Sequence, residues 1–272
     1  MKRLEGRVGI VTGAASGIGR ATAHGLAARG CDLALADIDA SNLEAVASEL
    51  EAPERFVSTH VVDTADREAM RNFAQEVDRA HGHAHILVNN AGVASGDSLE
   101  DLSWEDLEWI VGINFWGVVH GIKFFLPLIR REEEGHVVNI SSMFGFVGLP
   151  FQGPYCATKA AVRSLSETLY VELADSPIGV TSVHPGFIRT NIVRSARMGD
   201  DSRRKESVDL FDRHGTDPTV VARRIVDAID RNRSRVVVTP EAHLVDWLKR
   251  LAPRLTQRLV RRFWPNFDSE QA

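Results

Sequence analysis

The stretch V-G-I-V-T-G-A-A-S-G-I-G, from Val8 to Gly19, joins an apolar run to a glycine-rich turn. The run Val8–Thr12 is typical of a buried strand, and the residues after Gly19 favour a helix that ends near Arg29. Glycines in such a turn let backbone amides approach a pyrophosphate at the positive end of the helix. A strand before the turn and a helix after it are the context that this motif requires. The stretch therefore predicts the first unit of a dinucleotide-binding fold.

The alternation of strand and helix continues along the chain. Strands are expected at Val8–Thr12, Cys31–Ala36, Arg55–Val62, Ile86–Val88, His136–Ile140, Val180–Val183 and Arg235–Val238. Further helices are expected between them, at Ser41–Leu50, Arg67–His81, Ser103–Ile129, Gln152–Ala174 and Val220–Ile229. Such alternation is typical of a parallel sheet. The sequence predicts an α/β, doubly wound (Rossmann-type) fold, with a seven-stranded parallel sheet and helices on both faces.

Length and composition are those of an ordinary globular protein. The chain has 272 residues, of which 44% are hydrophobic and 25% charged, so one domain suffices. A formal net charge of −5 argues against a nucleic-acid partner. The two cysteines, Cys31 and Cys156, have no metal or disulfide spacing, so we expect buried packing residues and no metal. The N-terminus has no long apolar segment, and we expect a cytoplasmic, soluble protein.

The chemistry is expected in the stretch Asn139–Ala161. Ser142 follows the apolar run His136–Ile140, and Tyr155 and Lys159 lie four residues apart on a segment of helical composition. Residues at that spacing share a helix face. We expect the lysine cation to lower the pKa of the phenol, which makes Tyr155 a usable acid or base. With a serine hydroxyl to hold the substrate oxygen, the pattern indicates a carbonyl/alcohol site; the alternative is a surface pair beside an ordinary strand end.

Taken in order and spacing, the glycine-rich turn, N-N-A-G at Asn89–Gly92, N-I-S-S and Y-x-x-x-K resemble the short-chain dehydrogenase/reductase family, in its single-domain branch. The resemblance covers about Gly6–Thr190. It implies hydride transfer between a nicotinamide and an alcohol or ketone carbon. Tyr155 would exchange the substrate proton, Ser142 would orient the substrate oxygen, and Lys159 would lower the tyrosine pKa and hold the nicotinamide ribose.

Asn114 lies inside the expected helix Ser103–Ile129, which Ser103 and Asp106 open as a capping box. An asparagine at mid-helix competes for backbone hydrogen bonds, and from composition alone it is a mild defect. The resemblance implies instead that Asn114 opens the helix locally and supports a proton relay to the catalytic lysine.

NAD is the expected cofactor. Asp37 lies 18 residues after Gly19, where dinucleotide-binding folds place an acid on the adenosine ribose. Its carboxylate would repel a 2′-phosphate, and the family's basic NADP positions are occupied by Ala15, Ser16 and Ile38. The alternative is that Asp37 only begins the turn D-I-D-A. The cofactor residues that the motifs and the resemblance imply are Gly13, Ser16, Gly17, Ile18, Gly19, Asp37, Asp63, Thr64, Asn90, Ala91, Gly92, Tyr155, Lys159, Pro185, Gly186, Ile188 and Thr190.

Asp63 and the segment Asn90–Gly92 also have a structural alternative. Asp63 would meet the adenine amino group, or it would only belong to the helix start D-T-A-D. Asn90 and its neighbours would line the cofactor, or they would form no more than a turn.

The substrate is expected to be a hydrophobic secondary alcohol or ketone. Apolar residues flank the motifs at Phe144, Phe146, Val147, Leu149, Phe151, Phe187, Ile192 and Val193. Within a substrate loop of about residues 187–215, Asn191–Arg213 is polar and poorly periodic, which suits a mobile flap or a plain surface loop. One rival function is an NADPH-dependent ketone or 3-oxoacyl reductase, against which Asp37 argues. The other is a non-catalytic NAD-binding scaffold, which would not require Asn114, Ser142, Tyr155 and Lys159 together.

The C-terminal part has a different character. We expect residues 1–245 to form the single catalytic domain and residues 246–272 a basic, amphipathic extension. Trp247–Phe267 carries six positive charges and no acid, which leaves −11 on the remainder. Apolar residues at helical spacing predict two short helices. Packing on the acidic body or on a neighbouring subunit is favoured, and contact with a membrane surface is the alternative. The resemblance implies a homodimer or homotetramer that pairs Ser103–Ile129 with Gln152–Ala174.

Overall fold

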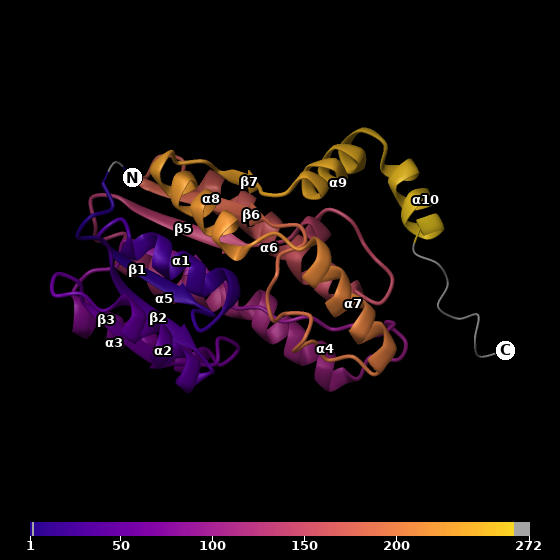
Figure 1. Cartoon of the computed structure of the whole chain (residues 1–272). Helices are drawn as coiled ribbons and strands as arrows, with labels where there is room; N and C mark the ends of the chain where they lie inside the picture. Colours follow the sequence, from indigo (N-terminus) through magenta and orange to yellow (C-terminus); the bar gives the residue numbers. More distant parts are fainter. Residues whose placement is uncertain (2, 264–272) are drawn as a thin grey trace.

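A computed structural model describes residues 1 and 3–263, so residues 264–267 of the expected tail lie outside the described part. Seven parallel strands form one sheet in the order β3-β2-β1-β4-β5-β6-β7 (Figure 1). The strands are β1 Val8–Thr12, β2 Asp32–Asp37, β3 Val57–Val61, β4 Ile86–Asn89, β5 Gly135–Ile140, β6 Ile178–His184 and β7 Arg235–Val237. The predicted doubly wound sheet is confirmed.

Helices cover both faces of the sheet. Helices α1 (Gly17–Ala27), α2 (Ala40–Leu50) and α8 (Pro218–Asp230) share one apolar core with the sheet. Helices α3 (Arg67–His81), α5 (Gly117–Ile129) and α6 (Gly153–Glu172) share the other. Strand β2 shows why both layers form: Leu33 and Leu35 belong to the first core, and Ala34 belongs to the second. Successive side chains of a strand point to opposite faces, so a strand buried on both sides is apolar throughout.

The strand order reverses between β1 and β4, which are neighbours in the sheet but are separated in sequence by β2 and β3. The chain leaves β1 toward one edge of the sheet and returns at β4 toward the other. Such a switch point opens a crevice at the carboxyl ends of the strands, which is where ligands bind in this architecture.

The long helix expected at Ser103–Ile129 is present, but it has an interruption. It consists of α4 (Trp104–Val111), a π-helical turn η1 (Gly112–Trp116) and α5. The predicted serine cap is present, because Ser103 Oγ accepts a hydrogen bond from Asp106 N at 3.0 Å. The Asp106 side chain accepts from the Ser103 hydroxyl at 2.8 Å and not from its backbone N–H, so the capping box is only half formed. By length and composition the whole helix could cross a membrane. Its α5 part packs against the sheet, with Phe125 and Ile129 fully buried, so it is a core helix.

The expected flap contains a helix that the sequence did not indicate. Helix α7 spans Asp201–His214, and the side chain of Asp200 caps it by accepting from Ser202 N and Arg203 N. No residue of α7 is buried. Because apolar periodicity arises from a buried helix face, a helix without one leaves no such signal.

Two further helices end the described chain. Helix α9 spans Pro240–Leu251 and α10 spans Pro253–Phe263, and both lie beyond the end of the sheet (Figure 1). Helix α9 begins five residues before the expected boundary at residue 245 and therefore belongs partly to the domain. Cys31 and Cys156 are both buried and free, as expected.

Candidate active site

A cleft of about 410 Å³ opens at the carboxyl ends of the strands. Nearly all residues expected at a cofactor or catalytic site line it. These are Gly13, Ser16, Gly17, Ile18, Asp37, Asp63, Thr64, Asn90, Ala91, Gly92, Ser142, Tyr155, Lys159, Pro185, Gly186, Ile188 and Thr190. Gly19 and Asn114 do not line the cleft, and both lie buried behind its wall.

The glycine-rich turn is shaped by contacts that only glycine permits. A Cβ atom on Gly19 would lie 1.9 Å from the carbonyl oxygen of Gly13, so α1 could not keep its position against the turn. Gly17 has φ +53°, in the left-handed region. Helix α1 begins at Gly17, and the side chain of Ser16 makes no capping hydrogen bond there. The first amides of α1 thus lack a side-chain partner, which fits an anionic pyrophosphate.

The N-N-A-G segment is tied directly to this turn. Asn90 Nδ2 donates to the carbonyl oxygens of Thr12 at 2.9 Å and Gly13 at 3.1 Å. Thr12 Oγ1 accepts from Asn90 N at 3.0 Å and Ala91 N at 3.1 Å. Asn90 therefore holds the ends of β1 and β4 together, in addition to lining the cleft.

Two acids occupy the expected strand ends. Asp37 Oδ2 accepts from Ala15 N at 2.9 Å, and its Oδ1 accepts from Asp39 N at 3.1 Å. Asp37 thus supports the glycine-rich turn and its own turn while it lines the cleft. Asp63 accepts from Ala65 N at 2.9 Å, whereas the cap of α3 is Asp66. The alternative role of Asp63 is therefore that of a turn residue and not of the helix cap.

The expected catalytic side chains converge on one wall of the cleft. Ser142 and Lys159 are buried, and Tyr155 is part-buried. Lys159 Nζ lies 5.7 Å from the centre of the Tyr155 ring and donates to the carbonyl oxygen of Ile140 at 3.1 Å. Ser142 Oγ accepts from Phe144 N at 3.2 Å at the start of the turn η2 (Met143–Gly145). The strand end and the helix α6 together bring these groups to one place.

The pKa of Tyr155 lies above its usual value of 10, whereas a pKa lowered by Lys159 was expected. Burial raises the pKa of Tyr155 to about 12, and a hydrogen bond with Ser142 acts in the opposite direction. Burial also lowers the pKa of Lys159 to about 8. The loss of solvation thus disfavours both the phenolate of Tyr155 and the ammonium group of Lys159.

Asn114 lies in the π-helical turn, so the local opening of the helix that was expected there is present. Its side chain accepts from Val93 N at 2.8 Å and donates to Val93 O at 2.9 Å. It also donates to Thr158 Oγ1 at 3.3 Å, and Thr158 in turn donates to the carbonyl oxygen of Tyr155 at 2.9 Å. Asn114 therefore connects the segment after β4 with the helix that carries Tyr155 and Lys159.

The substrate end of the cleft is apolar, but only part of its wall was expected. Phe144, Phe187, Ile192 and Val193 line the cleft, whereas the expected Phe146, Val147, Leu149 and Phe151 do not. Phe146 packs against the buried ring of His184 with centroids 4.5 Å apart, so it belongs to the core. Wall residues that the sequence did not indicate are Trp109, Ile113, Ala196, Met198, Leu210 and Phe211.

The segment that carries several of these residues is fastened over the cleft. A parallel β-bridge joins Ser95 to Arg197, and the guanidinium of Arg203 donates to the carbonyl oxygen of Gly96 at 2.8 Å. The carbon of the Arg197 guanidinium lies 4.2 Å from the centre of the Trp109 ring. The expected flap thus forms an ordered wall of the cleft.

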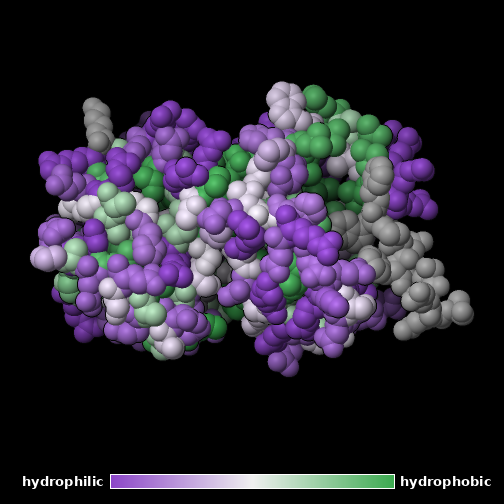
Figure 2. All heavy atoms as spheres, viewed as in Figure 1, coloured by the Kyte–Doolittle hydropathy of each residue, from purple (hydrophilic) through white to green (hydrophobic). Residues whose placement is uncertain are grey.

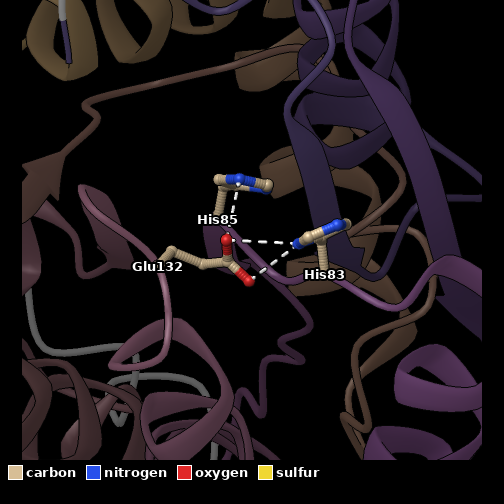
Figure 3. A group of neighbouring side chains, drawn as sticks. All are labelled: His83, His85 and Glu132. Atoms are coloured by element: carbon tan, nitrogen blue, oxygen red, sulfur yellow. Dashed lines mark hydrogen bonds and ion pairs between the residues drawn. The ribbon is translucent and has the colours of Figure 1, made fainter.

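A second polar group lies just before β4 and β5, at the amino-terminal ends of these strands. Figure 3 shows its three side chains. His83 Nδ1 and His85 Nε2 lie 3.1 Å and 3.3 Å from carboxylate oxygens of Glu132. Val8 N donates to His85 Nδ1 at 3.1 Å, so in the neutral ring Nε2 carries the proton and donates to Glu132. A metal ligand requires a lone pair on Nε2, and this hydrogen-bond pattern leaves none. The group is therefore explained by hydrogen bonds.

Known proteins resemble this chain in fold and in sequence. A family model described as short chain dehydrogenase matches residues 7–201. The putative oxidoreductase SadH of Mycobacterium tuberculosis is 39% identical over 264 residues, which cover 96% of this chain and 96% of SadH. A short-chain dehydrogenase/reductase from Burkholderia phymatum in complex with NAD matches with a TM-score of 0.87 and 31% identity, covering 94% of this chain and 96% of that one.

An alcohol dehydrogenase from the archaeon Thermococcus sibiricus, complexed with 5-hydroxy-NADP, matches with a TM-score of 0.75 and 26% identity over 86% of this chain and 96% of that one. The family match contains the glycine-rich turn and the catalytic candidates. On this agreement of sequence, fold and cleft, the chain belongs to the short-chain dehydrogenase/reductase family of oxidoreductases.

Proposed function

We propose that this oxidoreductase uses NAD to interconvert a hydrophobic secondary alcohol and its ketone. Membership of the family makes it an enzyme that acts on CH–OH groups. The observation that carries the finer proposal is the composition of one cleft. Its turn end has the uncapped helix α1 and Asp37, and its other end has Tyr155 beside apolar side chains.

The cleft fits a nicotinamide dinucleotide, and the acid at the end of β2 favours NAD. The carboxylate of Asp37 lines the cleft where the adenosine ribose is expected and would repel a 2′-phosphate. Ile38, the next residue, is 69% exposed and offers no positive charge. Related structures hold NAD in one case and an NADP derivative in another, so the fold alone does not decide the cofactor.

In the proposed mechanism, NAD supplies the acceptor or donor of the hydride. Ser142 Oγ holds the substrate oxygen by a hydrogen bond, and Tyr155 Oη exchanges the proton with that oxygen. Because burial keeps the phenol protonated at neutral pH, Tyr155 is poised to donate a proton to a ketone oxygen. Lys159 holds positive charge beneath the phenol and the expected nicotinamide ribose, and that charge would stabilise the phenolate that ketone reduction leaves and that alcohol oxidation needs as its base.

Asn114 positions this machinery without lining the cleft. Its hydrogen bonds to Val93 and Thr158 hold the start of α6 against the segment after β4. The family resemblance assigns it a proton relay to Lys159, and we retain that role as part of the proposal.

The proposed substrate class follows from the cleft wall. Phe144 and Phe187 meet edge to face with centroids 6.2 Å apart, and Phe187 meets Phe211 in the same way at 5.2 Å. Met198 and Ile192 complete an apolar surface near Tyr155. Such a wall favours a hydrophobic alcohol or ketone over a polyol or a sugar acid. An NADPH-dependent ketone or 3-oxoacyl reductase would use the same groups, and Asp37 argues against it.

The test is a steady-state comparison of NAD and NADP with a panel of secondary alcohols that differ in apolar surface. We expect kcat/KM with NAD to exceed that with NADP by at least about tenfold, which corresponds to about 1.4 kcal/mol. We also expect kcat/KM to rise from short alcohols to bulky apolar ones. Equal use of both cofactors would refute the cofactor proposal, and a preference for polyols would refute the substrate class.

We further propose that the protein is a cytoplasmic homodimer or homotetramer.

A further inference from the structure

The last two described helices expose an apolar stripe. Leu244, Trp247, Leu251 and Leu255 are 59%, 62%, 75% and 47% exposed. The first three lie at positions i, i+3 and i+7 of α9, so they share one helix face. Figure 2 shows hydrophobic side chains gathered over α9 and α10. We call these four residues the apolar stripe.

Helix α9 is fixed to the body by its other face. Ala242 is fully buried, and Val245 packs against the cluster that contains Ala242 and Phe146. Asp246 is buried and accepts from Arg235 at 2.7 Å and from Arg250 at 2.9 Å. The expectation that the stripe packs on the protein's own body is therefore wrong, because the face that packs is the opposite one; packing on a neighbouring subunit, the other part of that expectation, stays a prediction.

The stripe is bordered by unpaired positive charge. From residue 247 to residue 263 the chain has six basic residues and no acid. In the part of the chain that the structure describes, Arg250 pairs with Asp246, whereas Arg254, Arg258, Arg261 and Arg262 form no ion pair. On α10 these arginines occupy one side of the helix, and Leu255 and Leu259 occupy another, which makes the helix strongly amphipathic.

We propose that α9 and α10 bind the surface of a membrane that contains anionic lipid. An exposed apolar stripe with arginines beside it is the composition of helices that lie in the membrane interface, where apolar side chains enter the acyl boundary and basic ones meet lipid phosphates. A second copy docked through the same surface would bring two sets of unpaired arginines together with no acid between them. Charge therefore favours a lipid surface over a copy of the chain that docks through this same surface.

This surface adjoins the cleft. Glu241, in the first turn of α9, accepts a hydrogen bond from Phe187 N at 3.0 Å, and Phe187 lines the cleft. A membrane-bound α9 thus holds one wall of the cleft next to the lipid. The inference concerns a surface outside the cleft, so it stands or falls independently of the proposed reaction.

The experiment is co-sedimentation of the full chain with vesicles of phosphatidylcholine alone or mixed equally with phosphatidylserine. We expect binding to the mixed vesicles, weak binding to the neutral ones, and release as salt is raised. The double substitution Trp247→Gln and Leu251→Gln removes apolar surface and should weaken binding by at least about tenfold. Arg258→Gln with Arg262→Gln should weaken it by about 30-fold.

The matched control is Val61→Gln with Leu99→Gln, because these two side chains are 65% and 73% exposed but lie outside α9, α10 and the two long helices expected at a subunit contact. It should bind like the unaltered protein. The oligomeric state of every variant is measured by light scattering, and NAD binding checks that each is folded. Protein that stays in the supernatant at low salt would overturn the proposal. So would a Trp247/Leu251 variant that changes oligomeric state while its vesicle binding is unaltered, because the stripe would then be a contact between copies.

Discussion

Loss of the proton from the buried side chain of Lys159 should contribute stability to the folded protein as the pH rises above neutral. Lys159 is 3% exposed, and burial lowers its pKa from 10.5 to about 8. Between about pH 8 and pH 10.5, Lys159 keeps its proton in the unfolded chain but has released it in the folded chain. Stability rises with pH wherever the unfolded state binds more protons, so the free energy of unfolding should increase across this window.

The size of the effect follows from the two pKa values. The full difference between 10.5 and about 8 corresponds to about 3 kcal/mol. Between about pH 7 and about pH 9.5 the linkage relation gives about 2 kcal/mol, because only part of the transition lies in that range. Tyr155 titrates above this range in the folded protein and contributes little.

The assay compares the unaltered protein with Lys159→Met in the absence of cofactor. Urea unfolding can be followed by the fluorescence of the five tryptophans. The difference in unfolding free energy between the two proteins reports the contribution of Lys159 alone. From about pH 7 to about pH 9.5, this difference should shift by about 2 kcal/mol in favour of the unaltered protein. Lys123→Met, at an exposed lysine of α5, is the control and should leave the pH dependence unchanged. A difference that does not vary with pH would refute the burial argument.

Other predictions concern catalysis, cofactor choice, the glycine turn and assembly. Tyr155→Phe should lower kcat by about 100-fold or more yet retain NAD binding in fluorescence titrations, and near-normal turnover would contradict its proton-exchange role. Asp37→Ala with Ile38→Arg should narrow or invert the ratio of kcat/KM for NAD to that for NADP, and an unchanged ratio would contradict the charge argument. Gly19→Ala should lower the melting temperature and abolish NAD binding, because its Cβ would lie 1.9 Å from a carbonyl oxygen, whereas Gly148→Ala meets nothing within 4 Å and should do neither. Light scattering at micromolar concentration should give a dimer or tetramer and not a monomer.

The sheet could be predicted because most of its strands are buried on both faces, the edge strand β3 being the exception. Runs such as Val8–Thr12 are apolar throughout, and the turn after this run has glycines at positions where a Cβ atom would collide with backbone. Local composition therefore reports the strand, the turn and the helix that follows. Helix α7 was missed for the converse reason, since none of its residues is buried.

The candidate site was likewise only partly predictable from the sequence. Tyr155 and Lys159 could be recognised from their spacing, since a helix places residues four apart on one face. The direction of the tyrosine pKa could not be predicted from the sequence, because it depends on how much protein surrounds the phenol, and burial outweighs the hydrogen bond with Ser142. Which phenylalanines face the cleft was equally undetermined: Phe144 lines it, while Phe146 packs on His184.

The sequence by itself determined the order of the elements, the seven strands and the identity of the polar groups at the strand ends, because each depends on neighbours within about one helical turn or one strand. Tertiary structure decided the burial, the pKa values and the neighbours of those groups. The electrostatics of Tyr155 and Lys159, the second wall of the cleft and the exposure of Trp247 and Leu251 all arise from segments distant in the chain. An amphipathic pattern shows that a helix has an apolar face, but only the folded chain shows whether that face meets the body or the solvent.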